Sequence, residues 1–161
     1  MLCSRGWIFR IDGGSWNLEF RILNLGKGMI DTKITTFTDL EVWQEGHKLV
    51  LMIYQETKSF PKEEIYGLIS QLRRSSVSVT SNIAEGFGRY SYQEKLRFYY
   101  MAHGSLTELQ NQLLIARDVG YLSQERFQKI AAQTISAHKL LNAFISSTKQ
   151  LVQNSIPNSK F

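Results

Sequence analysis

Apolar and small residues recur at alternating spacings of three and four along most of this chain, and this period constrains the fold more than any other feature. Residues at such spacings share one face of an α-helix, and faces repeating every 3.5 residues pack against one another in helical bundles. The four successive stripes are Trp43, Gly46, Val50, Ile53 and Thr57; Ile65, Ile69, Leu72, Ser76, Val79 and Ile83; Tyr99, Ala102, Leu106, Leu109, Leu113 and Ala116; and Phe127, Ile130, Thr134, Ala137, Leu141, Phe144, Thr148 and Leu151.

Short breaks between the stripes predict where the helices begin and end. Capping boxes, proline and glycine are the usual signals at such positions. The signals are Thr38 with Glu41, Phe60-Pro61 before a second helix over about 62–86, Gly86 or Gly88, Ser91 with Glu94, and Gly120 with Ser123. Because the connections are short, consecutive helices should be antiparallel. The sequence therefore predicts an all-α fold, an antiparallel up-down-up-down four-helix bundle.

The chain divides into an N-terminal extension over 1–36, the bundle over 37–152 and a flexible tail over 153–161. The extension lacks a helical period and is expected to be poorly ordered or non-native. Gly13-Gly14 is a turn signal, and the alternating stretch 16–21 allows a weak hairpin. An alternative is that the native chain begins at Met29. The codons for 26–28 would be purine-rich, as a ribosome-binding site is, and 1–28 would be an over-extended start.

Composition favours a globular protein that does not enter membranes. The 161 residues include one cysteine, Cys3, so no disulfide forms within the chain. No apolar run approaches the roughly 18–20 residues that cross a bilayer, and the N-terminus lacks the continuous apolar region of a signal peptide. A cytoplasmic location is expected. The net charge of +5 is modest for one protomer and would count for more if several copies aligned their basic faces.

One polar cluster interrupts the apolar pattern near the end of the second stripe. Asn82, Glu85 and Arg89 are spaced to share one helix face. In the structural interpretation, hydrogen bonds of such polar groups fix the register of packed helices. This structural polar motif consists of Asn82, Glu85, Gly86, Ser105 and Glu108. The alternatives are a ligand or nucleic-acid contact at the helix end and a catalytic carboxylate. A single glutamate without a partner acid, histidine or metal motif favours catalysis least, and no catalytic residue is predicted.

Five motifs give the chain a family resemblance. They are D-L-x-V-W at 39–43, F-P-x-x-E-x-Y-G-L at 60–68, Q-L-R-R-S at 71–75, N-I-A-E-G-x-G-R at 82–89 and G-S-x-x-E-L at 104–109. Over about 37–150 the chain resembles the 23S rRNA intervening-sequence protein family of bacterial four-helix bundles. The resemblance implies a ring-shaped homopentamer without enzymatic activity. The chain is also similar to the accessory variability determinant of diversity-generating retroelements, which implies nucleic acid and a reverse transcriptase as partners.

Basic and aromatic residues around the second and third stripes indicate a surface for nucleic acid. The candidate phosphate contacts are Arg73, Arg74, Arg89, Lys95 and Arg97, and the candidate stacking residues are Tyr90, Tyr92, Tyr99 and Tyr100. The alternative is a solvated face, with Arg73 paired to an acid such as Glu108, and tyrosines that pack in the bundle.

Three histidines are the remaining candidates for chemistry. His47, His103 and His138 fall on three different helices and form no H-x-x-x-H or E-x-x-H pattern, so no metal and no cofactor are predicted. The sequence thus predicts a non-enzymatic, oligomeric accessory protein that binds structured RNA or DNA through its basic surface. The alternative is a protein-interaction scaffold that does not bind nucleic acid.

Overall fold

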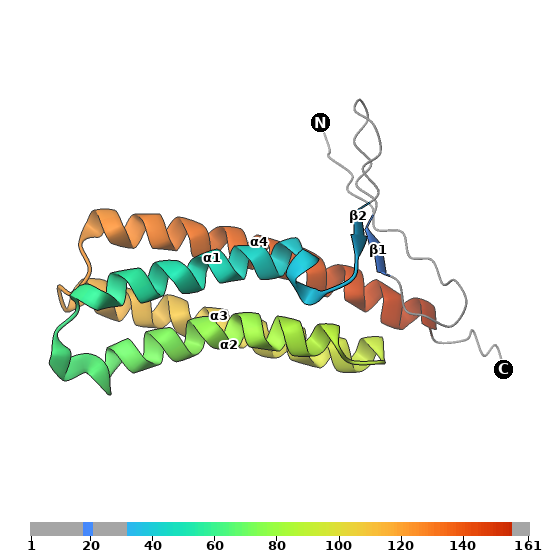
Figure 1. Ribbon diagram of the computed structural model, residues 1–161, viewed down its shortest axis with the longest axis horizontal. Helices are drawn as coiled ribbons and strands as arrows, with labels where there is room; N and C mark the ends of the chain where they lie inside the picture. The colour runs from blue at the N-terminus through green and yellow to red at the C-terminus, as the bar shows by residue number, and fades with distance from the viewer. Residues whose placement is uncertain (1–17, 21–31, 156–161) are drawn as a thin grey trace, which may run out of the picture.

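The computed structural model describes residues 18–20 and 32–155, and four long helices dominate this part of the chain (Figure 1). They are α1 (Glu41–Glu56), α2 (Leu68–Phe87), α3 (Tyr92–Asp118) and α4 (Gln124–Ser155). Each helix packs against the next, and α4 returns to α1. Figure 1 shows successive helices running in opposite directions. The predicted all-α four-helix fold is confirmed, and these directions are consistent with the predicted antiparallel up-down-up-down topology.

The first helix begins differently from the prediction. A short 3-10 helix, η1 (Phe37–Asp39), precedes α1, and Leu40 is the N-cap residue of α1. The capping box involves Thr36 and Asp39, whose carboxylate accepts the backbone N–H groups of Thr35 at 2.9 Å and Thr36 at 2.8 Å. The predicted box of Thr38 with Glu41 is therefore wrong. The carboxylate three residues after an N-cap residue can accept these free N–H groups. In this chain the N-cap with that carboxylate is Thr36, two residues before the predicted Thr38.

The connection between α1 and α2 is longer than predicted. It contains two 3-10 helices, η2 (Thr57–Ser59) and η3 (Lys62–Ile65), so α2 begins at Leu68 and not at residue 62. The Glu64 carboxylate accepts the Leu68 N–H at 2.8 Å and so satisfies one of the free N–H groups at the start of α2. Ile65 precedes α2 and is 52% exposed, so its predicted place in the core is wrong.

A two-stranded antiparallel sheet lies beside the bundle in Figure 1, with β1 (Leu18–Phe20) paired to β2 (Thr32–Ile34). The predicted turn at Gly13-Gly14 lies outside the described residues, as do the proposed start at Met29 and the last six residues. Ile34 belongs to the hydrophobic core, so a residue assigned to the extension contributes to the bundle. Helix α4 continues to Ser155, so the first three residues of the predicted tail are helical.

The core consists of the predicted stripes. The start and the end of α3 follow the sequence signals. Apart from Ile65, the members of the four stripes are buried, or half-buried in the case of Trp43, Phe127 and Leu151. Ser91 caps α3 by accepting the N–H of Glu94 at 3.2 Å. Gly120 follows α3 with a φ of 81°, a conformation that side chains disfavour.

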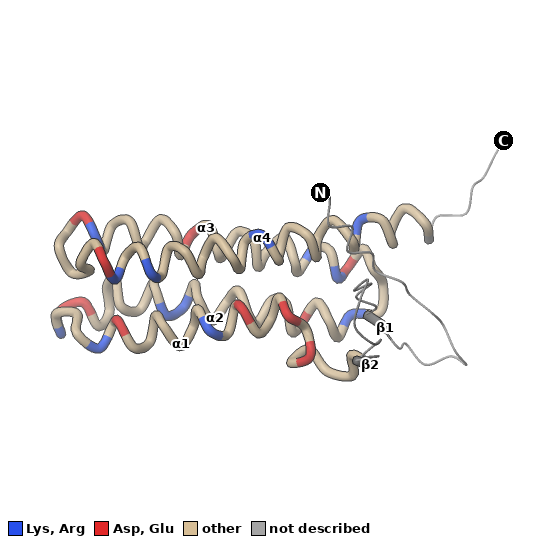
Figure 2. Tube along the Cα trace, turned by 90° about the horizontal axis from the view of Figure 1, so that it is seen from above, with Lys and Arg blue, Asp and Glu red and all other residues tan. Residues whose placement is uncertain are grey.

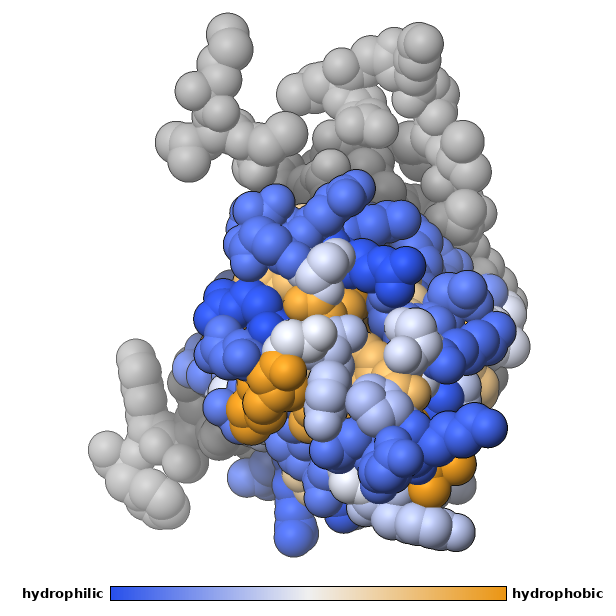
Figure 3. All heavy atoms as spheres, turned by 90° about the vertical axis from the view of Figure 1, so that its left-hand side faces the viewer, coloured by the Kyte–Doolittle hydropathy of each residue, from blue (hydrophilic) through white to orange (hydrophobic). Residues whose placement is uncertain are grey.

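The surface of the described chain mixes charges of both signs. Figure 2 shows Lys and Arg positions interspersed with Asp and Glu along the helices. At the end of the bundle seen in Figure 3, small hydrophobic patches lie among hydrophilic residues. Within the described residues, every helix is too short or too polar to cross a bilayer.

Candidate nucleic-acid interface

The polar residues that the sequence singles out lie along the junction of α2 and α3, which we call the α2–α3 seam. On α2 it contains Gln71, Arg74, Ser78, Asn82 and Glu85, Arg89 follows two residues after the end of α2, and on α3 it contains Arg97, Ser105 and Glu108. Spacings of three and four within α2, and of eight and three within α3, keep each set on one helix face. The two helices are antiparallel, so the start of α3 meets the end of α2.

Small polar side chains join the two helices at the centre of the seam. Asn82 donates to the backbone oxygen of Ser78 at 2.8 Å and to its hydroxyl at 3.2 Å. The Ser78 and Ser105 hydroxyls lie 2.9 Å apart across the helix boundary. Asn82 and Ser105 thus belong to one hydrogen-bonded network across the helix boundary, an arrangement consistent with the structural interpretation. Ser78 is the bridging residue, and it is absent from the polar motif predicted from the sequence.

At one end of the seam a polar chain leads from the core to the surface. Ser75 and Gln112 are buried, and the Ser75 hydroxyl donates to Oε1 of Gln112 at 2.7 Å. The Gln112 amide donates to Glu108 at 2.9 Å, and Arg74 lies 3.6 Å from the same carboxylate. Arg74 also donates to Gln71 at 3.1 Å. The ion pair expected between Arg73 and Glu108 is therefore made by Arg74.

Arg73 is directed toward α1 instead of the seam. Its Nε donates to the Thr57 hydroxyl at 2.9 Å, and its guanidinium lies 5.0 Å from the ring centre of Tyr54. Adjacent helical residues project about 100° apart, which separates Arg73 from Arg74. Of this basic pair, only Arg74 belongs to the candidate interface.

At the other end of the seam Arg89 is held by two contacts. It forms an ion pair with Glu85 in the last turn of α2, and its guanidinium lies 4.5 Å from the ring centre of Phe98 on α3. The Glu85 side chain is 53% exposed, so the expectation that it forms a buried or half-buried register contact is wrong. The Arg89 Nε is buried and has no hydrogen-bond partner among the described residues.

Lys95 serves the fold at this end of the bundle. Its ammonium donates to the Phe87 carbonyl at 2.5 Å and the Gly86 carbonyl at 3.5 Å, and it lies 5.6 Å from the Phe87 ring centre. These carbonyls are at the C-terminus of α2, where the helix dipole favours a cation. Burial lowers the pKa of Lys95. The structure thus gives Lys95 a capping role that differs from the predicted phosphate contact.

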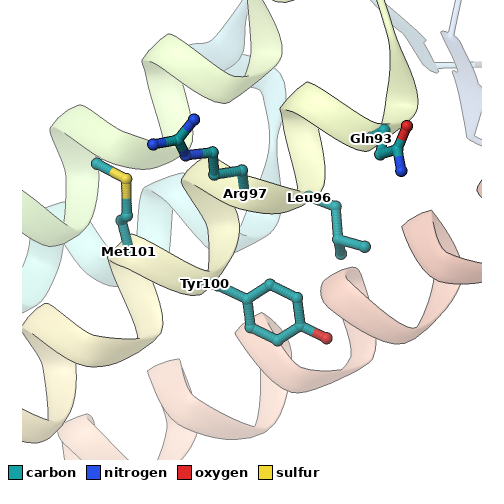
Figure 4. Close-up of a pocket in the computed structure, with 5 residues that line it drawn as sticks. All are labelled: Gln93, Leu96, Arg97, Tyr100 and Met101. Carbon is teal, nitrogen blue, oxygen red and sulfur yellow. The ribbon is translucent and has the colours of Figure 1, made fainter.

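Arg97 lines an open hollow on the surface of α3 (Figure 4). The hollow measures about 470 Å³, and Gln93, Leu96, Tyr100 and Met101 complete its lining. Arg97 is exposed and forms no ion pair, hydrogen bond or ring contact within residues 32–155. Figure 4 shows Tyr100 extending toward α4. The Lys149 ammonium lies 5.3 Å from the centre of its ring.

The four candidate stacking tyrosines differ in exposure. Tyr90 is 82% exposed and Tyr100 is 45% exposed, so both rings are accessible. Tyr92 is half-buried, and Tyr99 is buried against Phe144 with ring centres 4.6 Å apart. Burial also raises the pKa of Tyr99. The predicted stacking role is therefore wrong for Tyr99, which is a core residue.

The structure brings together two histidines that are 35 residues apart. Nε2 of His103 on α3 and Nε2 of His138 on α4 lie 2.7 Å apart. Burial and the neighbouring ring lower the pKa of His138. His47 lies elsewhere and stacks on Trp43 with ring centres 4.8 Å apart. Within the described residues there is no group of three or more His, Cys, Asp or Glu suited to a metal. Spacing along single helices cannot reveal a pair formed between two helices.

The fold and the seam define an antiparallel four-helix-bundle protein whose α2 and α3 are joined by a polar junction with arginines at both ends. Residues 38–143 match the model of the 23S rRNA-intervening sequence protein family, and the chain belongs to this family. It is also similar to a crystal structure of a protein of unknown function from the S23 ribosomal protein family of Bacteroides thetaiotaomicron. The identity is 21% and the TM-score 0.61, over 65% of this chain and 95% of the other. No curated protein matches.

Proposed function

We propose that this protein is a non-enzymatic accessory factor that binds structured RNA or DNA through the α2–α3 seam. The observation that carries the proposal is the guanidinium of Arg97, which has no partner among the described residues and lines an open hollow on α3. A cation without an internal partner can contact a phosphate without first breaking a contact of the fold. Tyr100, in the wall of the hollow, offers a ring face on which a base can stack.

The ion pairs of Arg74 and Arg89 are compatible with this role. Side-chain exposures are 71% for Arg74, with 45% for Glu108, and 40% for Arg89, with 53% for Glu85. Ion pairs at such exposure contribute about 0–1 kcal/mol, so a phosphate can compete for either arginine. Arg74 and Arg89 are fifteen positions apart, and the part of α2 from Arg74 to its end at Phe87 is about 20 Å long. This length matches about six base-pair steps at roughly 3.4 Å per step.

The modest net charge of +5 favours binding by an assembly. Positions of both signs are interspersed along the described helices (Figure 2), so one protomer presents no single basic face. We infer self-association, with the homopentamer of the resemblance as the expected form. Exposed apolar side chains on all four helices offer surface that self-association would bury. They include Leu51, Val77, Met101, Leu114, Ile115, Val119 and Ile135. Native mass spectrometry measures the number of subunits directly.

The surroundings of the two glutamates in the seam support binding without catalysis. Glu85 and Glu108 are both exposed and both face an arginine, which is the arrangement of surface ion pairs. General acids usually lie in surroundings that keep the carboxyl group protonated. The family name links these proteins to 23S rRNA intervening sequences, which makes RNA the first ligand to test.

A gel mobility shift with structured RNA and with duplex DNA, across a series of salt concentrations, tests the proposal. We expect Arg74→Glu combined with Arg97→Glu to weaken binding at least tenfold. The slope of log affinity against log salt should fall by roughly one for each phosphate that the variant no longer binds. The matched control is Lys129→Glu combined with Lys139→Glu, which reverses two exposed charges on α4. An equal loss of affinity in both double variants, or no binding by the wild type at low salt, contradicts the proposal.

The exposed apolar residues also favour a second candidate, a protein-interaction scaffold that does not bind nucleic acid. Ile115 and Val119 are one helical turn apart near the end of α3 and are 44% and 53% exposed. The scaffold predicts no mobility shift at low salt and a stable complex with a protein partner. A reverse transcriptase is the partner suggested by the resemblance, and co-purification from cells that express both chains tests it.

A further inference from the structure

The contact between His103 and His138 links the middle of α3 to α4. Their Nε2 atoms lie 2.7 Å apart, their ring centres are 4.5 Å apart, and the planes are inclined by 76°. Both side chains are half-buried, so one side of the pair remains open to solvent. Within residues 32–155 no carboxylate lies within ion-pair distance of either ring. The two imidazoles therefore meet as a pair of nitrogen donors without an acidic partner.

The separation of the two nitrogens is suited to one metal ion. A neutral imidazole binds late transition metals through a ring nitrogen at about 2.0–2.1 Å. Two such ligands at right angles would be about 2.9 Å apart, whereas tetrahedral ligands would be about 3.3 Å apart. The observed 2.7 Å is closer to the right-angle arrangement. Right angles are found in square-planar and octahedral complexes, which Cu²⁺ and Ni²⁺ adopt with nitrogen ligands.

We propose that His103 and His138 form an interhelical site for a divalent copper or nickel ion, with water completing the coordination. Each ring would supply Nε2 as a neutral imidazole, once the ring that donates in the contact has moved its proton from Nε2 to Nδ1 through solvent. Cu²⁺ should bind more tightly than Ni²⁺ by the general order of divalent metal affinities. Because the ligands come from different helices, the bound ion holds α3 and α4 together. Metal binding then stabilises the folded chain by mass action.

The inference departs from the expectation, drawn from spacing, that the chain binds no metal. That expectation excludes ligands on adjacent turns of one helix, where i and i+4 side chains meet. It does not address two ligands that come from adjacent antiparallel helices. His47 serves as the internal comparison, because it is exposed and stacks on Trp43, away from the pair.

The test uses the full chain without a histidine tag, in a Cys3→Ser background that removes the only thiol. CuSO₄ and NiSO₄ are titrated separately by calorimetry, and electron paramagnetic resonance of the Cu²⁺ form reports coordinated nitrogens. We expect one Cu²⁺ per chain, two imidazole nitrogens and a higher unfolding temperature. His103→Gln and His138→Gln should each weaken Cu²⁺ binding at least tenfold, whereas His47→Gln should bind as the parent does.

Any of three outcomes would overturn the site. The first is a parent protein that binds no Cu²⁺ at tens of micromolar. The second is a Cu²⁺ spectrum without two imidazole nitrogens, and the third is binding that persists in both glutamine variants. If a glutamine variant does not fold, the nitrogen count of the parent decides the question. Circular dichroism identifies that case before the titrations.

Discussion

Gly86 of α2 lies so close to Tyr99 of α3 that no side chain fits between them. A Cβ atom on Gly86 would be 2.5 Å from Cε1 of Tyr99 and 3.0 Å from Cβ of Phe98. Tyr99 is 2% exposed and cannot move outward, because it also packs on Phe144 of α4. The glycine therefore sets how closely α2 and α3 approach at the end of the seam where Arg89 and Arg97 lie.

Gly86→Ala should destabilise the protein by about 1–3 kcal/mol, because the added methyl group forces Tyr99 or the helices apart. Gly104→Ala is the matched control within a helix, since its Cβ would meet no atom within 4 Å. Gly104→Ala should stabilise the protein by about 0.5–1 kcal/mol. Urea unfolding measures both changes. Equal effects of the two substitutions would contradict the close approach at Gly86.

The buried contact between Ser75 and Gln112 predicts strong coupling between their substitutions. Ser75→Ala leaves Oε1 of Gln112 without its 2.7 Å partner in the core and should cost about 1–3 kcal/mol. Adding Gln112→Leu removes the orphaned group, so the double variant should be more stable than the sum of the single changes predicts. A double-mutant cycle by urea unfolding measures this coupling. Strictly additive effects would show that the hydrogen bond contributes nothing.

Glu45 predicts an acid-sensitive contact between α1 and α4. Hydrogen bonds from Lys48 and then Gln133 lower the pKa of its carboxyl group. Gln133 donates to it at 2.7 Å. A lowered folded-state pKa stabilises the fold above the ordinary value of 4.5, and this contribution disappears as the pH falls through the lowered pKa.

Unfolding free energies at pH 7 and pH 3 test this contact. Between these two conditions the wild type should lose more stability than Glu45→Gln, which has no charge to neutralise. Glu41→Gln, an exposed change on the same helix, is the control and should follow the wild type. A wild-type loss of stability equal to that of Glu45→Gln would exclude a role for the Glu45 carboxylate.

Substitutions of Lys95 and Arg97 should change different properties, although the residues are only two positions apart. The Lys95 change should lower stability, and the Arg97 change should weaken RNA binding. Lys95→Met removes the cation that caps α2 and should lower the unfolding free energy by about 1–2 kcal/mol. Arg97→Met removes no contact within the described chain and should change stability by less than about 0.5 kcal/mol. It should, however, weaken RNA binding. Urea unfolding measures the stability effect and the mobility shift measures the binding effect. Weaker RNA binding by Lys95→Met but not by Arg97→Met would argue against the seam as the interface.

The periodic stripes and the caps made by neighbouring residues could be predicted from the sequence. Ser91 caps α3 because its hydroxyl reaches an N–H group three residues later, a contact that needs no other part of the chain. The start of α2 was mispredicted because the stretch after Pro61 continues the apolar spacing. In the structure the carboxylate of Glu64 accepts the N–H of Leu68, and α2 begins only at Leu68.

The candidate site could be predicted only in part. Residue types and spacings place Arg74, Arg89, Arg97 and Asn82 near the junction of α2 and α3. They do not show that Arg73 is directed toward α1, that Lys95 caps a helix or that Tyr99 is buried. These outcomes depend on which neighbour each side chain reaches, and neighbours on other helices are set by the rotation and offset of whole helices.

The sequence by itself determined the number of helices, the faces they bury and their alternating direction, because apolar period and short connections act locally along the chain. Only the tertiary structure decided which polar groups meet: Ser75 with Gln112, Ser78 with Ser105, and His103 with His138. The physical reason is that many offsets of two amphipathic helices bury similar apolar area. Close contacts such as Gly86 against Tyr99 then select one offset, and that offset fixes every pair across the boundary.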